Sequence, residues 1–151
     1  HAHGIEGTLL DHPMPRYGSP MAWACETVRA LLRDGAFDST ALISTGEMAA
    51  IGLIRALHEH GLQAGRDVAV ATLGGDGLYP YAIPSLTAVE FADPVPYLAS
   101  CFEWIGSKKP WRGPLLMRPE RFSVFRGEST GMIVKPAAVA RSGAKHAVES
   151  R

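Results

Sequence analysis

The sequence predicts an α/β domain built on a mainly parallel sheet. Apolar segments of helical and strand period follow one another in the order helix, strand, helix, strand, strand, helix, strand. The chain has 151 residues, of which 46% are hydrophobic and 20% charged, as expected for one globular domain. Its formal net charge is zero, so the sequence predicts no basic surface for nucleic acid within this chain.

Four elements are predicted in the first half of the chain. Residues 21–32 carry apolar side chains at helical spacing and are followed by a basic residue and a glycine. Residues 40–44 form an apolar run of strand length. Residues 46–60 give the clearest helical pattern, with a wide apolar face that a glycine ends. Residues 67–73 carry β-branched side chains and no internal charge, which predicts a buried strand.

The second half adds three strands and one helix. Residues 86–91 predict a strand, and Asp93-Pro94 supplies the N-cap and first residue of a helix that reaches residue 105. Residues 113–117 and 122–125 predict two more short strands.

The ends of the chain and its cysteines suggest where the protein resides. The chain begins without Met and without a charged-then-apolar leader, so we expect a piece of a longer protein with no visible signal peptide. Residues 132–151 show no clear period and predict a mobile tail. Cys25 and Cys101 lie in apolar segments, which favours reduced, buried thiols and a cytoplasmic location over a disulfide framework.

Two candidate ligand-binding segments directly follow predicted strands. In parallel sheets, ligands bind outside the carboxyl ends of the strands, and residues 45–47 and 74–76 occupy such positions. The sequence GGDG at residues 74–77 has neither the spacing of a dinucleotide fingerprint nor the Gly-Lys-Ser/Thr of a P-loop. Two prolines follow it where a phosphate-binding loop would begin a helix. This loop is therefore predicted to be a plain turn or the rim of another kind of pocket.

Several motifs resemble those of the LacI/GalR (lac-repressor) family of transcription regulators. Residues 67–89, DVAVATLGGDGLYPYAIPSLTAV, are similar to the family's DVSVVGFDD and, after a variable segment, PPLTTV. Residues 40–62, TALISTGEMAAIGLIRALHEHGL, resemble its Thr-Ala-Ile, Asn-Asp-x-Met-Ala-x-Gly and Arg-Ala-Leu segments. Residues 115–131, LLMRPERFSVFRGESTG, resemble its closing Leu-x-Pro-x-Leu-x-x-Arg-x-Ser-Thr. The resemblance extends over residues 1–131, with HAHGI matching Arg-x-x-Gly-Phe.

The resemblance implies a Rossmann-like, parallel-sheet subdomain of a type I periplasmic-binding-protein fold, truncated at its N-terminus. Residues 1–131 would form part of an effector-binding and dimerisation domain, mostly its C-terminal subdomain. The helix within residues 92–107 would belong to the missing N-terminal subdomain, so we expect its apolar face to be poorly covered. The implied partners are a small-molecule effector, a second copy of the chain, and operator DNA bound by a missing helix-turn-helix.

The family's effector contacts map onto six positions of this sequence: His1, Gly46, Glu47, Gly74, Asp76 and Phe91. His1 stands where the family has arginine, Gly46 where it has asparagine, and Gly74 where it has aspartate. Unmatched ligand hydroxyls cost about 1–3 kcal/mol each, so we expect a ligand less polar than a sugar, or a degenerate site. Glu47 and Asp76 lie beside the lost positions and are candidate substitutes, although exposed carboxylates are normally just solvated.

The resemblance also implies a dimer interface built from three segments. Its residues are Met21, Ala22, Ile51, Ile54, Arg55, Leu78, Tyr79, Tyr81 and Ala82. Large aromatic side chains with a polar tip suit the core of an interface. The alternative is that Tyr79 and Tyr81 pack on their own domain.

Two other functions remain as alternatives. A sugar-binding protein of a transporter has the same implied fold and a similar pocket. A metal-dependent hydrolase would use the histidine pairs at residues 1 and 3 and at residues 58 and 60, but such sites need further ligands on other strands. No nucleophile elbow or Cys-His pairing is visible. The sequence therefore predicts a protein without catalysis, metal or cofactor.

Overall fold

A computed structural model of the chain describes residues 4, 6–10, 18–107, 110 and 122–131. Along the chain the elements are α1 (Pro20–Arg33), β1 (Ala41–Ser44), α2 (Glu47–Glu59), β2 (Ala69–Leu73), β3 (Thr87–Glu90), α3 (Val95–Ser107), β4 (Ser123–Phe125) and a short 3-10 helix, η1 (Glu128–Thr130). The predicted order of helices and strands is confirmed over these residues. The predicted strand at 113–117 and the predicted tail at 132–151 lie outside them.

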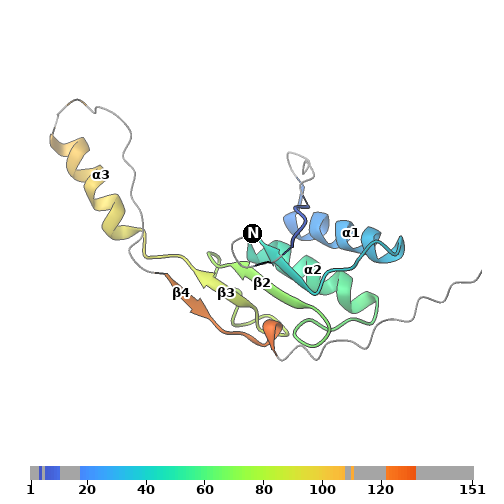
Figure 1. Cartoon of the computed structure of the whole chain (residues 1–151). Coiled ribbons are helices and arrows are strands. Elements are labelled where there is room, and N and C mark those ends of the chain that lie inside the picture. The colour runs from blue at the N-terminus through green and yellow to red at the C-terminus, as the bar shows by residue number, and fades with distance from the viewer. Residues whose placement is uncertain (1–3, 5, 11–17, 108–109, 111–121, 132–151) are drawn as a thin grey trace, which may run out of the picture.

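The four strands form one sheet in the order β1-β2-β3-β4 (Figure 1). The first three strands run parallel, and β4 pairs with β3 in the antiparallel direction. The mainly parallel sheet predicted from the sequence is therefore confirmed. The parallel strands are joined by α2 and by the segment between β2 and β3, and α2 packs on both β1 and β2.

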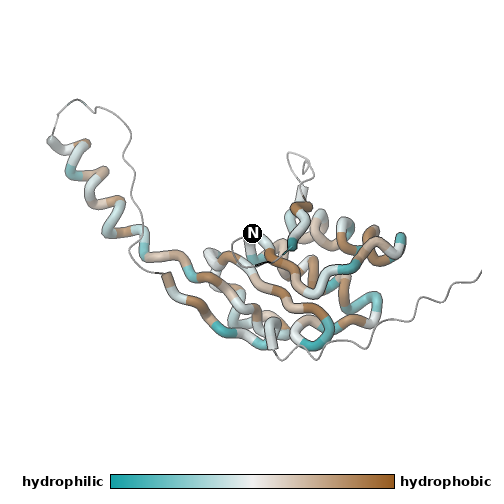
Figure 2. The backbone as a smooth tube through the Cα atoms, in the orientation of Figure 1, coloured by the Kyte–Doolittle hydropathy of each residue, from teal (hydrophilic) through white to brown (hydrophobic). Residues whose placement is uncertain are grey.

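The helix α2 covers one face of this sheet, and α1 lies beside α2 (Figure 1). Ser19 caps α1, because its hydroxyl accepts the Ala22 N–H at 3.4 Å, and Pro20 occupies the first turn. The two helices approach closely at Gly52, where an added Cβ would lie 2.1 Å from the Met21 carbonyl oxygen. Figure 2 shows hydrophobic residues along the strands and along both α1 and α2. The largest apolar side chains of this core with no exposed area are Val28, Leu57, Val70 and Leu86.

The opposite face of the sheet is open within the described part of the chain. Ile43 of β1 is 81% exposed and Val124 of β4 is 48% exposed. Parallel strands are normally covered on both faces, so this surface has the character of a buried one.

A hydroxyl in η1 connects the two central strands. The buried Ser129 hydroxyl donates to the Val70 carbonyl at 2.6 Å and accepts the Thr87 N–H at 2.9 Å. This Ser belongs to the RGEST sequence whose resemblance to the family's closing motif was noted above. The motif thus bonds to backbone groups of both β2 and β3.

The helix α3 stands away from the sheet (Figure 1). Asp93 accepts the Val95 N–H at 3.0 Å, so it caps the helix as predicted. No residue of α3 is buried, and the helix packs against no other element among the described residues. Leu98 and Phe102 are exposed, while Tyr97 and Cys101 are half-buried, in agreement with a poorly covered apolar face. Both cysteines were expected to be buried. Cys25 is buried, as expected, whereas Cys101 is only half-buried.

Candidate functional site

The carboxyl ends of the three parallel strands meet at one edge of the sheet. Ser44 pairs with Thr72 near the ends of β1 and β2, and Leu73 pairs with Val89 near the ends of β2 and β3. The segments that follow these strands are therefore neighbours. The two candidate segments predicted at residues 45–47 and 74–76 lie at this same edge.

Glu47 fixes the loop that follows β2. Its side chain is 1% exposed, and its carboxylate accepts hydrogen bonds from five consecutive backbone N–H groups. Oε1 accepts from Gly75 (2.7 Å), Asp76 (2.9 Å) and Gly77 (3.2 Å), and Oε2 accepts from Leu78 and from Tyr79 (3.1 Å).

Local structure explains why a carboxylate is stable there. Glu47 is the first residue of α2, where the helix dipole favours a negative charge, and Gly46 is the N-cap. Gly77 has φ +72°, a conformation that glycine adopts without steric cost. Burial alone would raise the pKa of Glu47, but the hydrogen bonds from the loop amides outweigh it and hold this pKa below its ordinary value. The carboxylate is therefore ionised and committed to the loop.

The same loop has a second anchor at Tyr79. Its hydroxyl donates to Glu90 of β3 at 2.6 Å, and its ring lies 5.0 Å from that of Phe125, centroid to centroid. Ser123 of β4 also donates to Glu90. The bonds from Ser123 and Tyr79 lower the pKa of Glu90, and the bond to Glu90 raises that of the Tyr79 phenol. The Glu90 carboxylate thus joins the loop to both β3 and β4.

A groove of ≈ 750 Å³ opens beside α2, and a smaller one of ≈ 510 Å³ lies at the carboxyl edge. The smaller groove is lined by Gly75, Gly77, Tyr79, Glu90, Phe91, Ala92, Asp93 and Pro94. It combines the Phe91 ring, 65% exposed, with the carboxylates of Glu90 and Asp93. Such a surface stacks against an apolar face and accepts hydrogen bonds from ligand hydroxyl or amino groups.

The structure places the predicted effector residues unequally around this edge groove. Phe91 lines it, and Asp76 is exposed on the loop between two lining glycines. Gly46 caps α2, and Gly74 is buried against Val89 and Tyr79. The Glu47 carboxylate faces the loop amides instead of the groove. His1 lies outside the described residues.

Sequence reasoning missed two polar residues of the edge groove. Glu90 directly precedes Phe91 at the end of β3, and Asp93 was assigned only as a helix cap. The signal that identifies Glu90 is its position as a charged residue at the carboxyl end of an otherwise apolar parallel strand. Asp93 already accepts the Val95 N–H, and it lines the groove as well.

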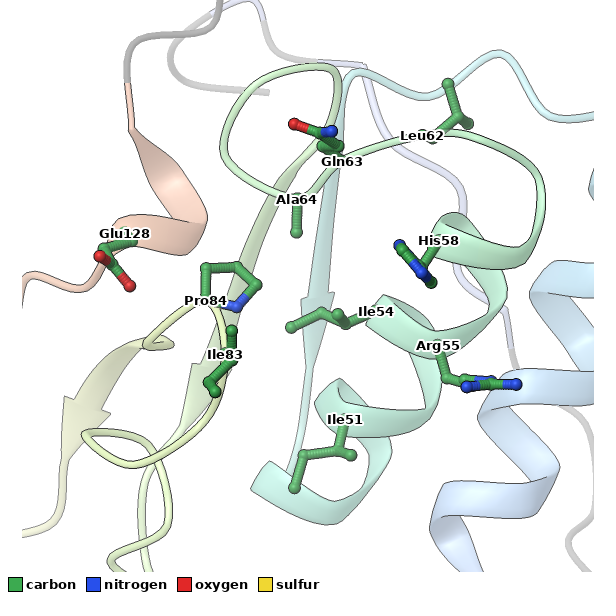
Figure 3. A pocket seen from close by; sticks show the side chains of 10 residues that line it. All are labelled: Ile51, Ile54, Arg55, His58, Leu62, Gln63, Ala64, Ile83, Pro84 and Glu128. Atoms are coloured by element: carbon green, nitrogen blue, oxygen red, sulfur yellow. The ribbon is translucent and has the colours of Figure 1, made fainter.

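The larger groove contains part of the predicted dimer interface (Figure 3). Its lining residues are Ile51, Ile54, Arg55, His58, Leu62, Gln63, Ala64, Ile83, Pro84 and Glu128. Ile51, Ile54 and Arg55 were predicted from the sequence. Figure 3 shows Ile83 and Pro84 across the groove from Ile54, so α2 and the segment after the glycine loop border one apolar hollow.

The other predicted interface residues differ in burial. Tyr81 is 85% exposed and Leu78 is partly exposed. Tyr79 and Ala82 pack against the core of their own domain. Met21 and Ala22 lie in the first turn of α1, and Met21 contacts α2 at Gly52.

Within the described ranges, no three or more His, Cys, Asp or Glu side chains are grouped so as to hold a metal ion. In the histidine pair at the end of α2, the Nδ1 atom of the C-cap residue His60 lies 2.9 Å from the Ala56 carbonyl oxygen, and His58 lines the larger groove. The same part of the chain contains no helix long and apolar enough to cross a membrane.

Comparison with known proteins gives the family. A family model described as a periplasmic binding protein-like domain matches residues 2–93. The lac repressor dimer bound to operator and an anti-inducer is a solved structure with TM-score 0.60 and 20% sequence identity, over 74% of this chain and 33% of that chain. No curated protein sequence matches the chain.

Two further solved structures are more similar in sequence. A PurR family transcriptional regulator from Vibrio parahaemolyticus is 26% identical with TM-score 0.56, over 81% of this chain and 42% of that chain. A sugar-binding transcriptional regulator of the LacI family from Escherichia coli is 26% identical with TM-score 0.58, over 87% of this chain and 45% of that chain. The chain spans less than half the length of each of these three proteins. It belongs to the periplasmic binding protein-like domain family and has the fold of a LacI-type effector-binding domain.

Proposed function

We propose that this chain is the effector-sensing and dimerisation portion of a LacI-type transcription regulator in the cytoplasm. It acts by binding, without catalysis, and operator DNA is bound by a segment outside these residues. The observation that carries the proposal is the groove at the carboxyl edge, which Phe91 and the Glu47-bound loop border together. Edges of this kind are where open α/β sheets bind their ligands.

The chemistry of the edge groove suits an effector with a flat apolar face and hydrogen-bond donors. Gly46 and Gly74 supply no side chain for the hydroxyls of a sugar, whereas Phe91 supplies an exposed ring. The polar groups are carboxylates, at Glu90 and Asp93, and carboxylates accept hydrogen bonds. We therefore assign to the site a less polar effector than the hydroxyl-rich ligands of a typical sugar pocket.

The uncovered faces of the fold fit a larger assembly. α3 has no packing partner in the described residues, and exposed apolar surface of this extent marks an interaction site. In the proposal, α3 packs on the N-terminal subdomain, which closes over the edge groove from the other side. The surface formed by α2 and residues 78–84 pairs with a second copy.

The effector assignment is tested by screening ligands against the full chain by thermal shift. The panel contains sugars and small aromatic compounds with amino or hydroxyl donors, and the matched variant is Phe91→Ala. We expect an aromatic donor compound to raise the melting temperature of the wild type, and the shift to disappear in the variant. A shift produced by sugars alone, or one that Phe91→Ala leaves intact, contradicts the assignment.

A further inference from the structure

The Glu47 carboxylate has a role other than that of a ligand contact. Two carboxylate oxygens offer about four acceptor sites, and five backbone N–H groups already occupy them. The side chain is also 1% exposed. An effector in the edge groove therefore finds no free acceptor on Glu47.

The two oxygens of this carboxylate hold two different parts of one loop. Oε1 binds the amides of residues 75–77, where Gly75 and Gly77 line the edge groove. Oε2 binds the amides of Leu78 and Tyr79, which begin the predicted dimer surface. Tyr79 also lines the edge groove, so one carboxylate holds residues of both surfaces.

Glu47 is also joined rigidly to the second wall of the dimer surface. It is the first residue of α2, and one turn later the same helix contributes Ile51 and then Ile54 to the larger groove. A displacement of the loop relative to α2 must break or stretch the bonds at Glu47. The same displacement alters the edge groove and moves Leu78, whose carbonyl accepts the N–H groups of Tyr81 and Ala82 just before Ile83 and Pro84 of the larger groove.

We propose that Glu47 is a positioning residue that fixes the loop of residues 74–79 to α2, so that the rim of the effector groove and the start of the dimer surface move together. The identities of those two surfaces rest on the proposed function, whereas the fixing of the loop does not. Glu47 would thus link effector binding mechanically to the arrangement of the dimer.

The test is amide hydrogen exchange of the full chain, measured by mass spectrometry on peptides that cover residues 74–79. Glu47→Gln replaces one carboxylate oxygen by an NH2 group, which cannot accept a hydrogen bond from the backbone N–H groups. At least two loop amides therefore lose their acceptor. We expect exchange of the loop to accelerate by about tenfold or more, as for loss of hydrogen bonds to a charged acceptor. Exchange of β2 is expected to stay unchanged.

Three further variants separate positioning from general destabilisation. Glu59→Gln makes the same change at the other end of α2, where the carboxylate binds Arg29 and Arg55, and should leave loop exchange as in the wild type. Tyr79→Phe removes the bond to Glu90 but keeps the backbone amide on Glu47, and should accelerate loop exchange less than Glu47→Gln. Glu47→Asp keeps the charge on a shorter side chain and should give an intermediate rate, and it replaces Glu47→Gln if that variant fails to fold.

Sedimentation velocity of the same samples tests the mechanical connection. The dimer should weaken by about tenfold in Glu47→Gln, in parallel with the loss of loop hydrogen bonds, and by less in Glu47→Asp. Unaltered loop exchange in the Glu47 variants overturns the positioning role, and faster loop exchange with an intact dimer overturns the connection. A monomeric wild type overturns the proposed dimer and with it the connection. The comparison of loop exchange between the Glu47 variants and Glu59→Gln still decides whether Glu47 positions the loop.

Discussion

Burial and hydrogen bonding have opposite effects on the pKa of Glu47. Removal from water favours the neutral acid, and bonds from the amides of Leu78, Asp76, Gly75 and Gly77 favour the carboxylate. The amides prevail, and the pKa lies below its ordinary value. The ionised form is consequently worth stability to the fold, in an amount that depends on pH.

The sign of this pH dependence follows from the depressed pKa. Glu47 contributes its full stabilisation above the unfolded-state pKa, about 4.3 for glutamate, and loses it as pH falls through the lower folded-state value. We expect urea unfolding to show a stability difference between wild type and Glu47→Gln that is constant near neutral pH. This difference should shrink as pH falls below about 4.3, where Glu47 of the unfolded chain takes up a proton while the folded carboxylate is still ionised. A difference that stays the same down to pH 3 would count against an ionised Glu47.

Sequence reasoning selected this residue but assigned its contacts incompletely. The resemblance placed Glu47 and Asp76 beside the effector positions, and both lie at the carboxyl edge. The five loop amides are 28 to 32 residues away along the chain, and no residue pattern reports which way a carboxylate turns. Glu90 was missed for a similar reason, because its partners Tyr79 and Ser123 are brought to it only by the sheet.

At the scale of elements, the packing of α1 on α2 depends on a residue with no side chain. Gly52 lies inside α2, where glycine disfavours the helix by about 1 kcal/mol relative to alanine. The Met21 carbonyl oxygen occupies the position that a Cβ would need. The close approach of the two helices is what explains a glycine in the middle of α2.

Substituting Gly52 is predicted to destabilise the fold despite the better helix propensity of alanine. The added Cβ would lie 2.1 Å from backbone oxygen, so the helices must separate, and overpacking of this kind costs about 1–3 kcal/mol. Chemical denaturation of wild type and Gly52→Ala measures this loss in the free energy of unfolding. The matched control is Gly106→Ala in α3, where no atom lies within 4 Å of the added Cβ and the change should be neutral or stabilising. Equal effects at both positions would contradict the packing argument.

The periodicity and capping signals of the sequence located every α-helix and strand of the described residues to within about two residues of its ends, whereas η1 was not predicted. Period and capping are local properties, which is why α1, α2 and β2 were recoverable. The direction of β4 and the separation of α3 from the sheet depend on distant partners. The antiparallel direction of β4 was not predicted. The exposure of α3 was expected only because of the resemblance to a known family.

At the scale of the whole molecule, the uncovered surfaces form a consistent set. One face of the sheet, the whole of α3 and the hollow beside α2 all expose apolar side chains among the described residues. A protein exposes such areas mainly where something else packs. The chain spans less than half the length of the three solved structures compared above, and its exposed apolar surface is consistent with packing inside a larger assembly.

The association state of the full chain shows whether the surface of α2 and residues 78–84 pairs with a second copy. Sedimentation velocity at micromolar concentration should find a wild-type dimer. Tyr81→Ser should weaken it by about 2 kcal/mol, as for an aromatic residue at the centre of an interface, because Tyr81 is 85% exposed in the single chain. Leu9→Ser, which removes an apolar side chain of similar exposure outside the proposed surface, should leave the dimer unchanged. A wild type that remains monomeric, or a dimer that Tyr81→Ser does not weaken, would contradict the account.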